Sequence, residues 1–102
     1  MNNARFYEMS KKHSSNKKGR YEVVVVNDDV NTFEHVINCL IEVCSHNYYQ
    51  AGQCATIIHN RGECSVFVDT HEECSAVCDE LIDLSLHVKL QKYKLPKDDS
   101  AN

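Results

Sequence analysis

The sequence of 102 residues predicts a single α/β domain whose elements follow in the order β-α-α-β-α-β. Three observations support this order. A run of four valines, residues 23–26, is typical of a buried strand. Three later stretches repeat apolar residues at intervals of three and four, as amphipathic helices do. Two shorter stretches alternate apolar and polar residues, as strands do.

The first strand is expected at residues 21–26. Because it is apolar on both sides, it suits a central strand or one covered on both faces. The first helix is expected at residues 31–45, with Asn31 as its N-cap and Glu34 completing a pattern close to a capping box. Its apolar stripe consists of Phe33, Val36, Ile37, Leu40, Ile41 and Cys44.

The second helix is expected at residues 48–60. Asn47 and Gln50 repeat the capping pattern at its start, and Gly62 is a stop signal after its end. Its apolar stripe consists of Ala51, Cys54, Ala55 and Ile58. Residues 63–69 then alternate and predict the second strand.

Thr70 and Glu73 form another capping-box pattern, which predicts a third helix over residues 71–86. Its apolar stripe consists of Cys74, Val77, Cys78 and Leu81. Residues 87–93 alternate with lysines on one side, a pattern typical of an edge strand. We therefore expect a flexible tail at 1–20, a folded core at 21–95 and a frayed end at 96–102.

Charge is distributed unevenly along the chain. Residues 1–20 contain six Lys and Arg and one acidic residue, whereas the remainder contains five basic and fourteen acidic residues. An acidic domain argues against nucleic acid as a partner. The sequence has neither an apolar run of membrane-spanning length nor a secretory leader, so we expect a cytoplasmic protein whose six cysteines are reduced.

The valine strand ends at Asn27, Asp28 and Asp29. Because side chains alternate along an extended chain, Asn27 and Asp29 are expected to face the same way. An amide oxygen beside a carboxylate suits an ammonium ion, which has several N–H donors. The alternative, which spacing alone favours, is that these residues form a turn and cap the helix.

His59 lies near the end of the second helix, where a histidine is favoured electrostatically and is often only structural. Beside a carboxylate rim it could complete an amine-binding site. His71, Cys74 and Cys78 resemble half of a zinc site, but both cysteines fall on an apolar stripe and the chain lacks a Cys-x2-Cys pair. A small zinc- or thiol-dependent protein is therefore an alternative hypothesis, and we expect no metal.

At these residues the chain resembles the ClpS family of Clp protease adaptors. Residues 26–29, Val-Asn-Asp-Asp, are followed by Asn-Thr-Phe-Glu-His-Val at 31–36, similar to the family's Asn-Asp-Asp-x-Thr-Pro-Met-Glu-Phe-Val. Gln50-Ala51-x-Gln53 and Ile58-His59-x-x-Gly62 follow, where the family carries a helix ending in Val-His-x-x-Gly. The resemblance covers roughly residues 21–92 and is looser after Gly62.

The resemblance implies an α/β sandwich with a three-stranded antiparallel sheet packed against three helices. It implies that Asn27, Asp29 and His59 hold the free α-amino group of an N-degron, a protein beginning with Leu, Phe, Tyr or Trp. Asp28 would fix the adjoining backbone. The first side chain would enter a pocket formed by Asn31, Phe33, Val36, Ala55 and Ile58. Phe33 and Ala55 stand where methionine is common, which affects the order of preference among first residues.

The resemblance further implies a monomeric adaptor that is not an enzyme, needs no cofactor and delivers its cargo to a ClpA- or ClpC-type AAA+ unfoldase. The unfoldase would engage the tail, and its N-terminal domain would dock elsewhere, with Glu72 and Glu73 as candidate contacts. The alternative is a protein of the same fold that regulates the unfoldase without binding degrons.

Overall fold

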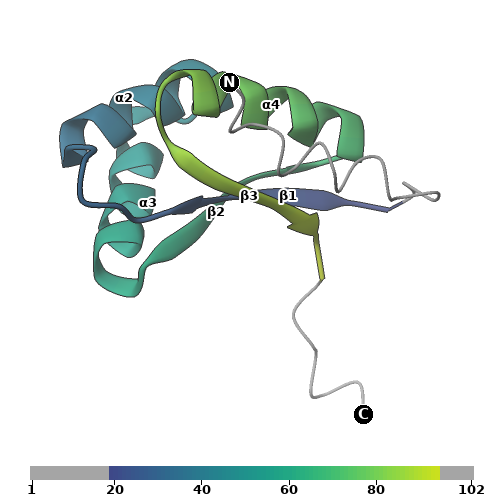
Figure 1. Cartoon of the computed structure of the whole chain (residues 1–102), viewed down its shortest axis with the longest axis horizontal. Coiled ribbons are helices and arrows are strands. Elements are labelled where there is room, and N and C mark those ends of the chain that lie inside the picture. The colour runs from purple at the N-terminus through teal and green to yellow at the C-terminus, as the bar shows by residue number, and fades with distance from the viewer. Residues whose placement is uncertain (1–18, 95–102) are drawn as a thin grey trace, which may run out of the picture.

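The structure is a computed structural model that describes residues 19–94 (Figure 1). Six elements follow one another: β1 (Tyr21–Val26), α2 (Phe33–Cys44), α3 (Tyr48–Arg61), β2 (Glu63–Asp69), α4 (His71–Asp83) and β3 (His87–Lys92). The predicted order β-α-α-β-α-β is confirmed. The predicted C-terminal end at 96–102, and the predicted tail up to residue 18, lie outside the described residues.

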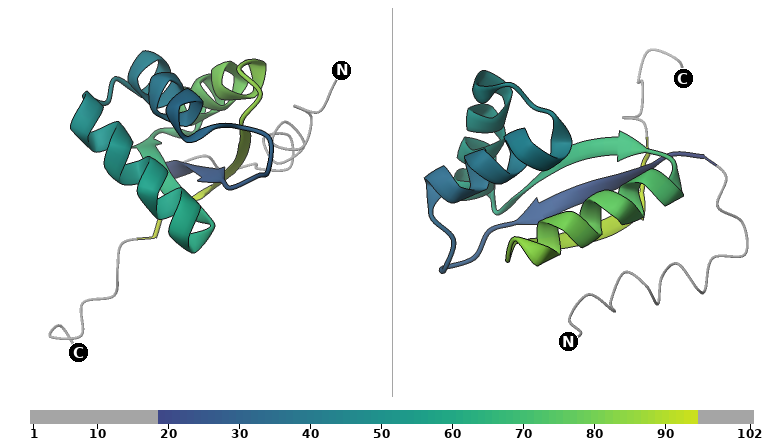
Figure 2. Two further views of the ribbon diagram at one scale, coloured as in Figure 1. Left: turned by 90° about the vertical axis from the view of Figure 1, so that its left-hand side faces the viewer. Right: turned by 90° about the horizontal axis from the view of Figure 1, so that it is seen from above.

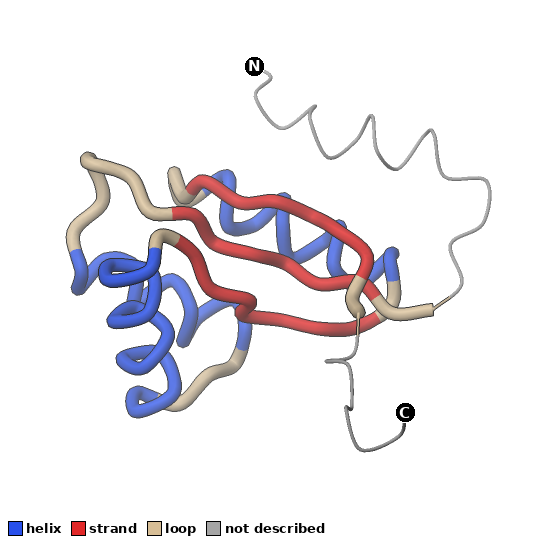
Figure 3. Tube along the Cα trace, turned by 90° about the horizontal axis from the view of Figure 1, so that it is seen from below, coloured by secondary structure: helices blue, strands red, loops and turns tan. Residues whose placement is uncertain are grey.

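The sheet has the order β2-β1-β3, and both outer strands run antiparallel to β1 (Figure 3). The predicted α/β fold with a three-stranded antiparallel sheet is therefore confirmed, with β1 in the centre and β3 at an edge. Val23 and Val25 belong to the core cluster, whereas Val24 is buried outside it. Lys89 of β3 forms an ion pair of 2.9 Å with Glu63 of β2, so its side chain crosses β1.

The helices enclose the core against the sheet. α4 contacts all three strands, α3 packs against β2, and α2 lies between α3 and α4 (Figure 2). The largest fully buried side chains come from these elements and include Ile37, Leu40 and Leu81. Among the described residues, no helix has the length and apolar character that crossing a membrane requires.

Two of the three predicted caps agree with the structure. Asn47 and Gln50 form a reciprocal capping box at the start of α3, and Gly62 ends that helix at φ 99°, a left-handed conformation that glycine adopts without strain. Thr70 caps α4 by accepting from the Glu73 N–H at 3.2 Å. In a full capping box the Glu73 side chain would accept the Thr70 N–H. Here the Asp69 side chain accepts it instead, at 2.7 Å.

The prediction that Asn31 caps the first helix is wrong. Thr32 is the N-cap of α2 and accepts from the His35 N–H at 3.0 Å, so the helix begins at Phe33. The Asn31 amide donates instead to Asp28 Oδ2 and to the Ser85 carbonyl, both at 2.8 Å. The third helix also ends earlier than predicted, at Asp83, because Ser85 turns the chain at φ 74°.

Candidate functional site

The end of β1 and the end of α3 meet at one rim. The Asn27 N–H donates to the Gly62 carbonyl at 2.8 Å, and Gly62 is the residue that terminates α3. His59 lies in the last turn of the same helix and is exposed. This hydrogen bond therefore brings Asn27 and His59, which are 32 positions apart in the sequence, to the same edge of the domain.

Asp28 is engaged within the loop that follows β1. Its Oδ1 accepts the N–H groups of Val30 and Asn31 at 2.7 and 2.8 Å, and its Oδ2 accepts the Asn31 amide. Burial raises the pKa of the Asp28 carboxyl, but these hydrogen bonds and nearby His87 outweigh it, so that the pKa is lower than usual. Asp28 is therefore ionised, and its hydrogen bonds stabilise the conformation of the loop.

Asp29 differs from Asp28 in having no partner among the described residues. It is exposed, and it forms no hydrogen bond or ion pair with any residue between positions 19 and 94. It does not line the cavity that Asn27 lines, although the alternation of side chains predicts that the two face the same way. The corner thus combines one carboxylate that is engaged and one that is available to a cation.

A small cavity of about 50 Å³ opens beside this rim. The end of β1, the loop after it, the first turn of α2 and the last turns of α3 supply its walls. It is lined by Asn27, Asn31, Phe33, Val36, Ala55, Ile58 and His59. The structure therefore brings together seven of the nine residues that the sequence predicts for amine and side-chain binding, and leaves out Asp28 and Asp29.

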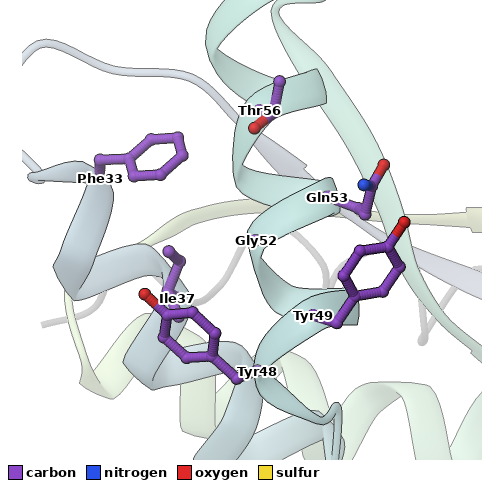
Figure 4. Close-up of a pocket in the computed structure, with 7 residues that line it drawn as sticks. All are labelled: Phe33, Ile37, Tyr48, Tyr49, Gly52, Gln53 and Thr56. Atoms are coloured by element: carbon purple, nitrogen blue, oxygen red, sulfur yellow. The ribbon is translucent and has the colours of Figure 1, made fainter.

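A second, larger hollow of about 350 Å³ lies between α2 and α3 and shares Phe33 with the first. Figure 4 shows Phe33 and Ile37 on α2 opposite Gly52 and Thr56 on α3. Tyr48, Tyr49 and Gln53 complete its lining. The Phe33 side chain lines both hollows and therefore lies between them. It is 49% exposed, so the rest of the domain packs against only part of its ring. No pattern in the sequence predicted this second hollow.

The remaining candidates lie away from the rim. Glu72 and Glu73 are exposed in the first turn of α4. Because Tyr21 pairs with Asp69, that turn lies at the end of the sheet opposite Asn27. Cys74 and Cys78 are buried, and no group of three or more metal-ligating residues lies together within the described part of the chain.

Two contacts of the loop were missed by sequence reasoning. The Ser85 carbonyl holds Asn31, and His87 Nδ1 lies 3.4 Å from Asp28 Oδ2. Both residues are more than fifty positions further along the chain. The pairing of Val26 with His87 in the antiparallel sheet brings them here, and that register has no local signal in the sequence.

Known proteins share the fold described above. The family model described as ATP-dependent Clp protease adaptor protein ClpS matches residues 16–91. Among solved structures, Agrobacterium tumefaciens ClpS2 bound to L-phenylalaninamide is similar, with a TM-score of 0.69 and 22% identity. The match covers 72% of this chain and 95% of that one, and it shows the fold. A search of curated proteins by sequence finds no match.

Proposed function

The chain belongs to the ClpS family of Clp protease adaptors, and from this we propose that it binds the first residue of N-degron substrates. In this proposal Asn27, Asp29 and His59 hold the free α-amino group. The pocket of Asn31, Phe33, Val36, Ala55 and Ile58 receives a Leu, Phe, Tyr or Trp side chain. The observation that carries the proposal is the cavity that joins Asn27 and His59 to this apolar lining.

The chemistry of a chain terminus suits such a rim. A free N-terminus is an ammonium ion with three donors, and each protein chain has only one. The Asn27 amide oxygen and a ring nitrogen of His59 offer acceptors. Asp29, which has no partner among the described residues, offers a charge. An internal peptide group brings one donor and no charge, so it would leave acceptors of the site unsatisfied. The site would therefore discriminate between a terminus and an internal segment.

The cavity that would receive the first side chain is smaller than an aromatic ring requires. A cavity of roughly 150 Å³ is known to hold a benzene ring, whereas this one encloses about 50 Å³. We infer that the half-exposed Phe33 ring moves aside and opens the cavity toward the neighbouring hollow. The related ClpS2 was solved with L-phenylalaninamide, a compound with a free α-amine and an aromatic side chain, which supports this class of ligand.

Delivery to an unfoldase is the second half of the proposal. The partner would be the N-terminal domain of a ClpA- or ClpC-type AAA+ unfoldase, with Glu72 and Glu73 among its contacts. These two residues lie at the end of the sheet opposite the candidate site, so an unfoldase and a substrate could be bound together. The adaptor would act as a cytoplasmic monomer without a cofactor, and residues 1–20 would be the segment that the unfoldase engages.

A peptide series with every residue at position one tests the proposal. Peptides beginning with Leu, Phe, Tyr or Trp are expected to bind about 10- to 150-fold more tightly than those beginning with Ala, Ser or Asp. This factor corresponds to the roughly 1.5–3 kcal/mol gained by burying a large apolar side chain. Fluorescence anisotropy with otherwise identical peptides measures it.

The controls are the same residues placed at position two behind a glycine, which are expected to bind weakly. Equal affinity across the series would contradict degron recognition. If purified unfoldase were nevertheless stimulated or inhibited by the substrate-free protein, the regulatory alternative would replace the proposal.

A further inference from the structure

Three side chains outside the candidate site form a separate cluster. Cys54 lies on α3, Cys64 on β2 and His46 in the loop between α2 and α3, and both cysteines pack against the hydrophobic core of the domain, in which α3 contacts β2. Both cysteines are partly exposed, whereas the other four cysteines of the domain, Cys39, Cys44, Cys74 and Cys78, are buried. Nothing in the proposed amine site uses this cluster.

A bulge in the sheet fixes the orientation of His46. Val23 pairs with Phe67 and Val24 with Ser65, so Val66 between them has no partner on β1. The Val66 carbonyl lies 2.8 Å from His46 Nε2. A carbonyl can only accept, so Nε2 carries the hydrogen and Nδ1 of the neutral ring carries a lone pair.

The lone pair of His46 faces a thiol. Nδ1 lies 3.9 Å from Cys54 Sγ, within hydrogen-bonding distance for sulfur, so the ring can act as a base for this cysteine. The neighbouring Cys64 thiol lowers the pKa of the Cys54 thiol, and His46 lowers it further against the effect of burial. The interaction with Cys54 raises the pKa of Cys64, and the Cys64 Sγ–H donates to the Ser65 carbonyl at 3.4 Å, so Cys64 remains a thiol.

We propose that Cys54 and Cys64 form a hydroperoxide-reactive thiol pair, in which Cys54 is oxidised first and Cys64 closes a disulfide. His46 accepts the Cys54 proton, and the thiolate sulfur attacks one peroxide oxygen. An S–O bond forms, the O–O bond breaks, and the departing hydroxide takes the proton back as water. Cys54 is then a sulfenic acid.

Cys64 completes the reaction. Its sulfur attacks Cys54 Sγ, the S–S bond forms and the S–O bond breaks. The second hydroxide leaves with the Cys64 proton as another water. In total, two thiols lose two electrons and one hydrogen peroxide becomes two waters. The bridge would join α3 to β2, next to Ala55 of the candidate site.

Cys44 is the competing partner. It lies at the end of α2, is close enough to Cys54 for the two to influence each other, and is buried, which raises its pKa to about 12. A thiol of this kind is inert toward peroxide. The titratable groups that influence Cys54 are therefore Cys44 from α2, His46 from the loop and Cys64 from β2.

The test treats the reduced full-length chain with hydrogen peroxide at pH 7. We expect the mass to fall by two hydrogens and peptide mapping to place the bridge between Cys54 and Cys64. Cys64→Ser is expected to retain a Cys54 sulfenic acid that dimedone traps, and Cys54→Ser to form no rapid bridge. Cys44→Ser, the matched control, is expected to leave the 54–64 bridge intact.

His46 is tested by the pH profile of Cys54 alkylation, a readout that a purely structural residue would not shift. His46→Asn is expected to slow alkylation at pH 7 about tenfold by raising the thiol pKa about one unit. A bridge to Cys44, a uniform slow oxidation of all six cysteines, or an unchanged profile in His46→Asn would overturn the proposal. None of these outcomes bears on the amine site, which is tested separately.

Discussion

Asp29→Asn is expected to weaken the binding of a Phe-initiated peptide by about 10- to 100-fold, because a hydrogen bond to a charged group contributes roughly 1.5–3 kcal/mol. Asp29 is exposed and forms no bond with another described residue, so its loss costs the fold little. The amide keeps the shape of the side chain, removes its charge and replaces one acceptor oxygen with an NH2 donor. Isothermal titration calorimetry with one peptide measures the difference, and His59→Ala is expected to act in the same direction.

Glu42→Gln is the matched control, because it removes one negative charge from an exposed position of α2 that lines neither hollow. It is expected to change the affinity by less than about twofold, as a distant surface charge does at physiological salt. Thermal unfolding followed by circular dichroism should give the same midpoint for both variants. Equal effects of Asp29→Asn and Glu42→Gln would remove Asp29 from the proposed clamp.

Leu40→Ala is expected to destabilise the domain by roughly 2–5 kcal/mol, because it combines lost apolar burial with a cavity. Leu40 is fully buried in the core cluster at the centre of α2. Phe33 and Val36, two of the residues that line the candidate site, lie on the same helix. Urea denaturation of the variant and the parent protein measures the loss of stability.

Ile57→Ala is the control for this substitution, since it removes a large apolar side chain that is exposed on α3. Its expected effect is within about 0.5 kcal/mol, as for other surface positions. Peptide binding by Leu40→Ala should decline only in proportion to the unfolded fraction. A loss of stability below about 1 kcal/mol would show that α2 is not anchored through Leu40.

Local patterns in the sequence were sufficient for most of the fold. The valine run predicted β1 because β-branched residues favour a pleated, buried strand. Asn47 with Gln50 and the glycine at 62 marked both ends of α3, since each requires only neighbouring backbone groups. These signals act over three to five residues, which is the range that sequence patterns describe well.

The misplaced cap shows where such patterns fail. Asn31 has the right chemistry for an N-cap, yet its amide is held by Asp28 and by the distant Ser85 carbonyl. Thr32 takes the role because the loop is drawn toward the end of α4. The order β2-β1-β3 and the bulge at Val66 are likewise set by pairing between distant segments. No local pattern in the sequence therefore predicted the contact of His46 with Val66.

The candidate site was predicted from motifs more than from physics. Spacing alone favoured a turn at Asn27, Asp28 and Asp29, and Asp28 does form one, with two backbone N–H groups on its carboxylate. The resemblance to ClpS supplied His59 as the partner of this corner. The structure adds the reason for their proximity, which is the bond from Asn27 N–H to the Gly62 carbonyl.

A comparison of one Phe-initiated peptide with its N-acetylated form tests the central claim most directly. Acetylation removes the charge and two of the three N–H donors but leaves the side chain and the rest of the sequence unchanged. Recognition of a free α-amino group predicts a loss of affinity of at least about 100-fold, since neutralising the amine leaves polar acceptors of the site unpaired. Equal affinity of the two peptides would contradict the account.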